Sequence, residues 1–253
     1  VMRVLPFENE EVNECWIADR DRFSYEALNG ADRLTRPMLK QGGVWNEVSW
    51  QAALEYIANG LQQIKKDHGA TKIGALVSPH STLEELYLAR ALVQGVGSGN
   101  IDYRLRNAEF TAQQGVNWLG CSIASLSALQ SVLVVGSNLR KDHPLFAQRV
   151  RQAARKGAVV TAIDSVVRDW AMPVAHTLVA QSNAWVQALA DVAAAVAQAK
   201  GVVAPQPQGQ AGEVAESIAQ ALLVGERKAI LLGNAAAHHA QASNLLALAQ
   251  WIG

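Results

Sequence analysis

The sequence has little cysteine and no excess of charge of either sign. Its two cysteines, Cys15 and Cys121, are too few for a disulfide framework and form no Cys-x-x-Cys pair. Lys plus Arg and Asp plus Glu both total 22, so the formal net charge is 0 and no global field would recruit a polyanion. These deficits exclude a disulfide-stapled protein and argue against a nucleic-acid-binding one.

Long apolar runs are also missing. No run approaches the roughly 18–20 residues that span a bilayer, and the N-terminus has no signal-peptide pattern. We therefore expect a chain that is cytoplasmic or is held at a membrane only through partners. Because the sequence opens Val1-Met2, we also expect it to be a fragment of something longer.

What is present is typical of a globular α/β protein. Half of the 253 residues are apolar and 17% are charged, which allows one large domain or one domain plus a piece of another. The clearest unit is a strand at residues 132–135, a helix from Pro144 to Arg155, Gly157, and a second strand at residues 159–163. This β–α–β pattern with continuously apolar strands predicts a parallel sheet covered on both faces.

Further elements follow from the same signals. Ser49 is the predicted N-cap of a helix with apolar residues at helical spacing, and Ser81 followed by Glu84 predicts a capping box before the next helix. We expect the first helix to bury one stripe, formed by Trp50, Ala53, Leu54, Ile57, Leu61 and Ile64. Strands are predicted at 73–77 and 229–232, and helices at 214–223 and 239–252.

Two segments carry a family resemblance. The first runs through Asp32-Arg33-Leu34-Thr35-Arg36-Pro37, Gly42-Gly43-Val44-Trp45 and Val48-Ser49-Trp50. The second comprises Val135-Gly136-Ser137-Asn138, His143-Pro144 and Ile163-Asp164. Both are similar to the molybdopterin oxidoreductase family, which implies a doubly wound, mostly parallel α/β sheet with helices on both faces. The resemblance places that domain at residues 35–253, with residues 1–34 as the end of a small four-iron iron–sulfur domain.

The resemblance also identifies the positions that hold the pterin dinucleotide in working family members. These positions are Gly136, Ser137, Asn138 and Asp164. Two cofactor loops depart from the family pattern: Asp-Pro-Arg is replaced by Asp164-Ser165-Val166, and Pro-Gly-Thr-Asp by Gln181-Ser182-Asn183-Ala184. We therefore interpret the four positions as vestigial, with Gly136 and Asn138 retained for turn geometry.

The molybdenum ligand is the most informative departure. In the family, the segment matching Asn100-Ile101-Asp102 is followed by a Cys, selenocysteine or Ser bound to the metal, and that position falls on Ala108. A methyl group cannot coordinate a metal. We expect no cofactor in this chain, unless Asn107 or a water replaces the usual ligand.

Cys15 is the predicted metal ligand of the N-terminal part. It matches the fourth Cys of a four-iron cluster whose other three ligands would lie outside this chain. The alternative is that Cys15 is an ordinary small buried residue. Within the family, the surrounding residues Asn13-Glu14, Trp16-Ile17 and Arg22-Phe23 are most similar to the G-type subunits of bacterial NADH-quinone oxidoreductases, that is, of respiratory complex I.

That branch passes electrons from NADH through iron–sulfur clusters toward quinone, with other subunits of the peripheral arm of complex I as partners. The resemblance implies that this chain is a non-catalytic scaffold of such a subunit, peripheral on the cytoplasmic side of the inner membrane. One alternative is a working molybdopterin enzyme of the formate dehydrogenase or nitrate reductase type. Another is a pseudoenzyme that binds a small molecule where the sheet strands end.

Overall fold

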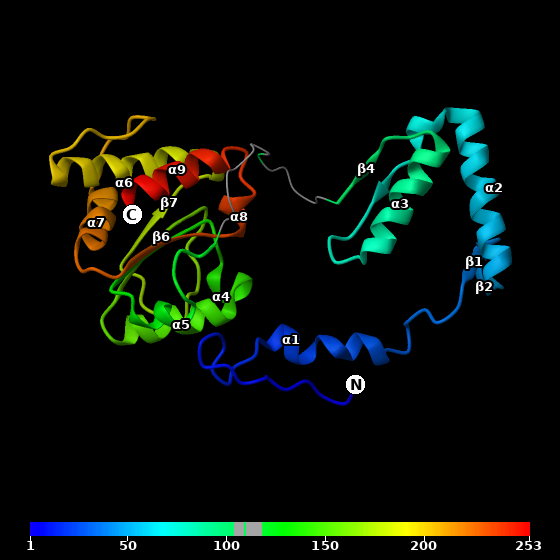
Figure 1. Ribbon diagram of the computed structural model, residues 1–253, viewed down its shortest axis with the longest axis horizontal. Helices are drawn as coiled ribbons and strands as arrows, with labels where there is room; N and C mark the ends of the chain where they lie inside the picture. The colour runs from blue at the N-terminus through cyan, green and yellow to red at the C-terminus, as the bar shows by residue number, and fades with distance from the viewer. Residues whose placement is uncertain (104–108, 110–117) are drawn as a thin grey trace. The chain divides into compact units, whose positions relative to one another are not determined.

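The computed structural model describes residues 1–103, 109 and 118–253, which belong to two compact units (Figure 1). The larger unit comprises Val1–Tyr25 and Asn107–Gly253, and the smaller comprises Glu26–Arg106. Within the described ranges, no helix has the length and apolarity needed to cross a membrane.

The larger unit is built on a four-stranded parallel sheet. Its strand order is β7-β6-β5-β8. The strands are β5 (Ser131–Val135), β6 (Val159–Asp164), β7 (His176–Val179) and β8 (Lys228–Leu232). In register, β5 pairs Val132 with Val160 of β6 and Val135 with Leu232 of β8. The parallel sheet predicted from the apolar strands is confirmed.

Helices cover both faces of this sheet (Figure 1). On one face lie α6 (Trp185–Lys200), α7 (Glu213–Leu223) and α9 (Ala242–Ile252), and on the other lie α4 (Leu139–Asp142) and α5 (Pro144–Arg155). Side chains of β5 alternate between the two layers, with Leu133 packing in the first and Val132 in the second. Each such buried Val or Leu contributes about 1.5–3 kcal/mol. The doubly wound α/β fold is confirmed.

The sequence signals predicted to start and end helix α5 act as expected. Pro144 occupies the first turn of α5, and Gly157 follows that helix with φ 99°. The predicted helix 239–252 is wrong at its start, because α9 begins only at Ala242, after a separate short helix α8 (Asn234–Ala237). The ring of His239 accepts a hydrogen bond from the backbone N–H of Gln241 at 3.0 Å, and this local bond competes with a continuous helix.

The described part of the smaller unit contains two small sheets and two α-helices, besides short 3-10 helices. Its elements are β1 (Met38–Gln41), β2 (Val44–Glu47), α2 (Trp50–His68), β3 (Ala75–Leu76), α3 (Leu83–Val96) and β4 (Ile101–Asp102). Strands β1 and β2 form a hairpin whose turn residues Gly42 and Gly43 have φ of 57° and 85°, as a two-residue turn of this type requires. The strand predicted at 73–77 is confined to β3, which pairs in parallel with β4.

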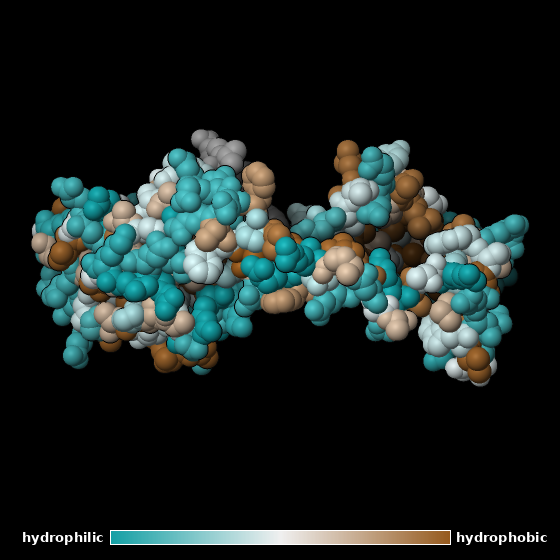
Figure 2. Space-filling view, turned by 90° about the horizontal axis from the view of Figure 1, so that it is seen from below, coloured by the Kyte–Doolittle hydropathy of each residue, from teal (hydrophilic) through white to brown (hydrophobic). Residues whose placement is uncertain are grey.

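Two predictions for this unit need correction. Ser49 does cap α2, but of its apolar stripe only Ala53 is buried, whereas Trp50 and Leu54 are 71% and 58% exposed. The spacing of apolar residues identifies the apolar face of a helix, but it does not show whether another element covers that face. Exposed apolar residues appear as brown areas in Figure 2. The capping box of α3 uses Thr82 and Glu85, one residue later than predicted.

Candidate functional site: the crevice at the carboxyl ends of the strands

The predicted dinucleotide positions lie together where strands β5 and β6 end. Gly136, Ser137 and Asn138 follow β5 directly, and Asp164 is the last residue of β6. Gly136 has φ 60°, and a Cβ at this position would lie 2.5 Å from the ring of Trp185. Only glycine fits both the left-handed backbone and this close contact, which agrees with a role in turn geometry.

The donors of this loop are already engaged by a carboxylate of the same chain. Asp142, at the end of α4, accepts hydrogen bonds from the Ser137 hydroxyl at 2.9 Å and from the Asn138 backbone N–H at 3.0 Å. Ser137 is buried, so its hydroxyl needs a partner within the fold. The Ser137 hydroxyl and the Asn138 backbone N–H are therefore already bonded within the chain.

Asp164 is also engaged internally. Its carboxylate is 2% exposed and accepts hydrogen bonds from Arg168 Nε at 2.7 Å and from the Ser165 backbone N–H at 2.6 Å. The hydrogen bond to Asp164 raises the pKa of the Arg168 guanidinium, which therefore remains cationic. A buried carboxylate with a charged partner is satisfied without a ligand.

The loop in place of Pro-Gly-Thr-Asp is held by the C-terminal part of the chain. Residues 182–184 form a short 3-10 helix, and the Ser182 carbonyl oxygen lies 2.9 Å from His239 Nε2. His239 stacks on Trp185, whose indole N–H donates to the Ala180 carbonyl at 3.1 Å. These contacts hold residues 182–184 against Trp185 and His239.

The N-terminal segment places Cys15 on the surface of the larger unit. Glu14, at φ 53°, forms an ion pair with Arg149 of α5 at 2.9 Å. Arg149 also donates to the Glu10 carbonyl oxygen at 2.6 Å, which fastens both sides of the loop that precedes Cys15. Cys15 itself is exposed in this chain, and its role as a cluster ligand stays a prediction.

The structure says less about the other predicted positions. Ala108 and Asn107 lie outside the described residues, although the next residue, Glu109, accepts hydrogen bonds from the Ser243 N–H and hydroxyl at the start of α9. Cys121 packs at the margin of the core formed with α5. Within residues 1–103, 109 and 118–253, no three His, Cys, Asp or Glu side chains form a metal-binding group.

Sequence reasoning missed the residues that engage the predicted site positions and the loop before Cys15 from within the chain. Arg168 stands four residues after Asp164, a spacing that could have suggested their ion pair. Asp142 follows Asn138 by four residues, at the end of α4, and gives no comparable signal. Arg149 lies on a helix face that the sequence shows only as amphipathic.

Comparison with known proteins identifies the family. The model of the molybdopterin oxidoreductase family matches residues 33–252. The chain belongs to the molybdopterin oxidoreductase family. A second model, described as an NADH-ubiquinone oxidoreductase NDSU1/NuoG-like 4Fe-4S domain, matches residues 1–26 of this family member. Both parts of the resemblance drawn from the sequence are confirmed, whereas the predicted division between residues 34 and 35 stays a prediction.

The individual relatives carry names from more than one branch of the family. The chain is 35% identical over 163 residues to the G-type subunit of NADH-quinone oxidoreductase from Rickettsia felis, covering 64% of this chain and 24% of that protein. A putative formate dehydrogenase of Staphylococcus aureus is 29% identical over 162 residues, covering 61% of this chain and 16% of that protein. The chain thus spans a quarter or less of the length of these relatives.

One solved structure is similar in part. Acetylene hydratase from Pelobacter acetylenicus superposes with a TM-score of 0.48 at 15% sequence identity, covering 79% of this chain and 28% of that chain.

Proposed function

We propose that this chain is the part of a G-type NADH-quinone oxidoreductase subunit that joins an iron–sulfur domain to a molybdopterin-type domain, which serves as a scaffold. The whole subunit would pass electrons from NADH through iron–sulfur clusters toward quinone. The observation that carries the proposal is the order of the two matches, the 4Fe-4S domain at residues 1–26 followed by the oxidoreductase domain at residues 33–252. Its partners would be the other subunits of the peripheral arm, on the cytoplasmic side of the inner membrane.

We infer that the crevice has lost the molybdenum cofactor. The donors of Ser137 and Asn138 are bonded to Asp142, and Asp164 is bonded to Arg168. A dinucleotide phosphate would meet the Asp142 carboxylate at close range, where like charges repel strongly in a partly buried site. The residues present therefore do not fit the cofactor, and Ala108 offers no atom that could bind its metal.

The role proposed for Cys15 is to supply one thiolate to a four-iron cluster in the intact subunit. A cluster of this kind needs four ligands, and Cys15 is exposed on a loop that the Glu14–Arg149 ion pair holds in place. The other three thiolates would come from outside this chain. An exposed thiol on a fixed loop is what such shared ligation requires.

A metal and activity analysis tests the assignment. The native polypeptide that contains this sequence should be captured from membranes with an antibody to the chain, and its iron, sulfide, molybdenum and pterin should be measured. We expect iron and sulfide, NADH-quinone reductase activity, and no molybdenum. Stoichiometric molybdenum with extractable pterin would overturn the scaffold assignment.

The loss of the cofactor has a test of its own. Titration with pyrophosphate, followed by calorimetry, should show no binding to the wild-type chain. Asp142→Ala frees the Ser137 and Asn138 donors and should create weak binding, whereas Glu47→Ala removes an exposed carboxylate of the smaller unit and should not. Micromolar binding to the wild type would show that Asp142 does not exclude phosphate.

The second candidate is a working molybdopterin enzyme of the formate dehydrogenase or nitrate reductase type. It is favoured by the putative formate dehydrogenase that is 29% identical over 162 residues. Formate or nitrate turnover by the captured polypeptide, together with molybdenum, would establish this candidate in place of the first.

A further inference from the structure

Helix α4 is a single turn of four residues, Leu139–Asp142. An isolated turn of helix is unstable, because ordering its backbone yields only one or two hydrogen bonds. Leu139, which is 2% exposed, anchors this turn in the core. The rest of its support comes from polar contacts at its two ends.

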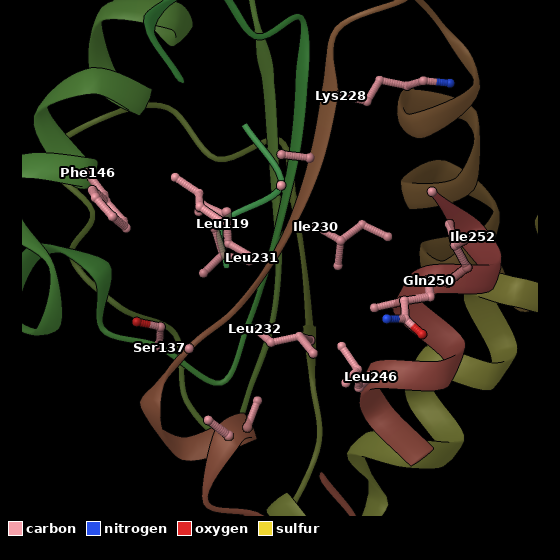
Figure 3. Close-up of a pocket in the computed structure, with 18 of the residues that line it drawn as sticks. Leu119, Ser137, Phe146, Lys228, Ile230, Leu231, Leu232, Leu246, Gln250 and Ile252 are labelled. Atoms are coloured by element: carbon pink, nitrogen blue, oxygen red, sulfur yellow. The ribbon is translucent and has the colours of Figure 1, made fainter. Parts of the chain in front are cut away.

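The first end is closed by the last residue of the helix itself. The Asp142 carboxylate folds back and accepts hydrogen bonds from the Asn138 backbone N–H at 3.0 Å and from the Ser137 hydroxyl at 2.9 Å. Figure 3 shows the Ser137 hydroxyl directed away from β8 and toward the green segment, to which α4 belongs. Asp142 therefore joins α4 to the β5 loop, by which we mean residues 136–138.

The other end is bonded by an arginine of the N-terminal segment. Arg20 lies in α1 (Asp19–Phe23) and donates to the Lys141 carbonyl oxygen at 2.9 Å and to the Asp142 carbonyl oxygen at 3.2 Å. The last carbonyls of a helix have no partner within it, and a cation at this end is favourable. Arg20 thus joins α4 to the segment that carries Cys15.

Both connections use the same residue, since Asp142 contributes its carboxylate to one and its carbonyl oxygen to the other. Because a turn of helix forms cooperatively, loss of support at one end weakens the order at the other. We propose that α4 couples the β5 loop to the N-terminal segment: Arg20, while it is bonded to α4, keeps Asp142 on the Ser137 and Asn138 donors. A third contact, from Arg140 to Asp169, keeps α4 attached when either connection is lost.

The coupling has a consequence for the crevice, and this consequence rests on the proposed exclusion of phosphate by Asp142. Release of Arg20 exposes the Ser137 and Asn138 donors to a small molecule that bears a phosphate group. A phosphate bound to these donors in turn weakens the hold of α4 on Arg20, because coupling between two sites is reciprocal. The β5 loop and the Cys15 segment therefore respond to each other.

Amide exchange of the chain tests the coupling. Arg20→Met removes both bonds to the α4 carbonyls, so the Asn138 amide at the opposite end should exchange at least about threefold faster. Conversely, Asp142→Ala should speed the exchange of the Asp21 amide, which donates to Ala18 within α1, by a similar factor. In the Asp142→Ala background, Arg20→Met should change the Asn138 rate little further, because the two effects are not additive.

Matched variants separate this coupling from a general loss of stability. Arg22→Met removes the same charge from α1 but leaves both Arg20 bonds in place, so the Asn138 rate should not change. The Leu133 amide in β5 reports the stability of the whole sheet and should keep its wild-type rate in every variant. Arg20→Lys keeps the charge but loses the planar pair of donors, and it should give a smaller effect than Arg20→Met in the same direction.

Pyrophosphate distinguishes a failure of the coupling from a failure of the proposed exclusion. Calorimetry should detect weak binding to Arg20→Met, although this variant has one cation fewer, and none to the wild type or to Arg22→Met. If Asp142→Ala bound no pyrophosphate, the exclusion by Asp142 would be wrong, whereas the exchange rates would still decide the coupling.

Three results would overturn the proposal. An unchanged Asn138 rate in both Arg20 variants, with faster exchange at Asp21, would show that the two ends of α4 are independent. Additive effects in the double variant would show the same. Equal acceleration of Leu133 and Asn138 in both Arg20 variants would assign the effect to unfolding of the larger unit.

Discussion

The carboxylate of Glu14 lies 2.9 Å from the guanidinium of Arg149, and this ion pair joins the N-terminal segment to helix α5. The Arg149 side chain is only 7% exposed, and Gln152 donates to the same carboxylate at 3.3 Å. Cys15 is the next residue along the chain, so its position depends on contacts made by a helix more than a hundred residues away. A cysteine on an otherwise irregular segment is thereby held in one place.

Arg149→Met should release this segment. The change leaves the Glu14 carboxylate without its cation and removes the donor to the Glu10 carbonyl, at an expected cost of about 1–3 kcal/mol to local stability. The amide of Glu14, which donates to Asn9, should then exchange at least about tenfold faster.

The matched control for Arg149 is Arg36→Met. Arg36 and Glu47 form an exposed ion pair at 3.0 Å, and such pairs contribute about 0–1 kcal/mol. Its loss should leave the exchange at Glu14 unchanged. If Arg149→Met also had no effect there, the ion pair would not be what holds the segment.

Gly136→Ala should destabilise the sheet of the larger unit. It combines a left-handed backbone with a Cβ placed 2.5 Å from the Trp185 ring, which we expect to cost about 2–5 kcal/mol. The hydrogen-exchange free energy of the Leu133 amide measures this loss. Gly157→Ala is the control, because Gly157 has positive φ but open space around it, and it should cost about 1–2 kcal/mol. Equal losses would mean that the contact with Trp185 has no energetic weight.

Thr82→Ala should weaken the start of helix α3. The Thr82 hydroxyl accepts from the Glu85 N–H at 3.2 Å, and the loss of such a cap costs about 1 kcal/mol. Faster exchange of the Glu85 and Leu86 amides would report the change. Ser81→Ala should leave them nearly unaffected, because the structure assigns the cap to Thr82. If Ser81→Ala sped up the exchange of these amides more than Thr82→Ala did, Ser81 would be the cap, as predicted from the sequence.

The pKa of the Asp169 carboxyl should lie below its ordinary value. The Ala171 backbone N–H and then the Arg140 guanidinium donate to this carboxylate and stabilise its charged form. The ionised Asp169 carboxylate contributes stability to the fold above its unfolded-state pKa. This contribution is lost as the pH falls through the lower folded-state pKa.

Carbon-detected NMR titration of Asp169 measures that midpoint. Arg140→Gln should raise it only in part, because the bond from Ala171 remains. Asp169 is fully exposed, so salt should screen the Arg140 contribution and move the wild-type midpoint in the same direction. A midpoint in the wild type that equals that of the unfolded chain would contradict the assignment.

The sequence predicted the parts of this fold that depend on neighbouring residues. Pro144 and Gly157 set the limits of α5, and the apolar runs at β5 and β6 require a sheet buried on both faces. The predicted site positions Gly136 and Asp164 were also brought together, because the carboxyl ends of adjacent parallel strands share one edge.

What the sequence did not predict depends on long-range contacts. Nothing in the order of residues showed that Asp142 would occupy the donors after β5, or that Arg149 would hold the loop before Cys15. The apolar stripe of α2 was visible in the sequence, yet its exposure was not.

The sequence by itself determined the family, the alternation of strands and helices, and the residue types available at each former cofactor position. The tertiary structure alone decided which partners those residues take. The physical reason is that periodicity and caps act within a few residues, whereas a hydrogen bond, an ion pair or a covered face requires two distant segments to meet at about 3 Å.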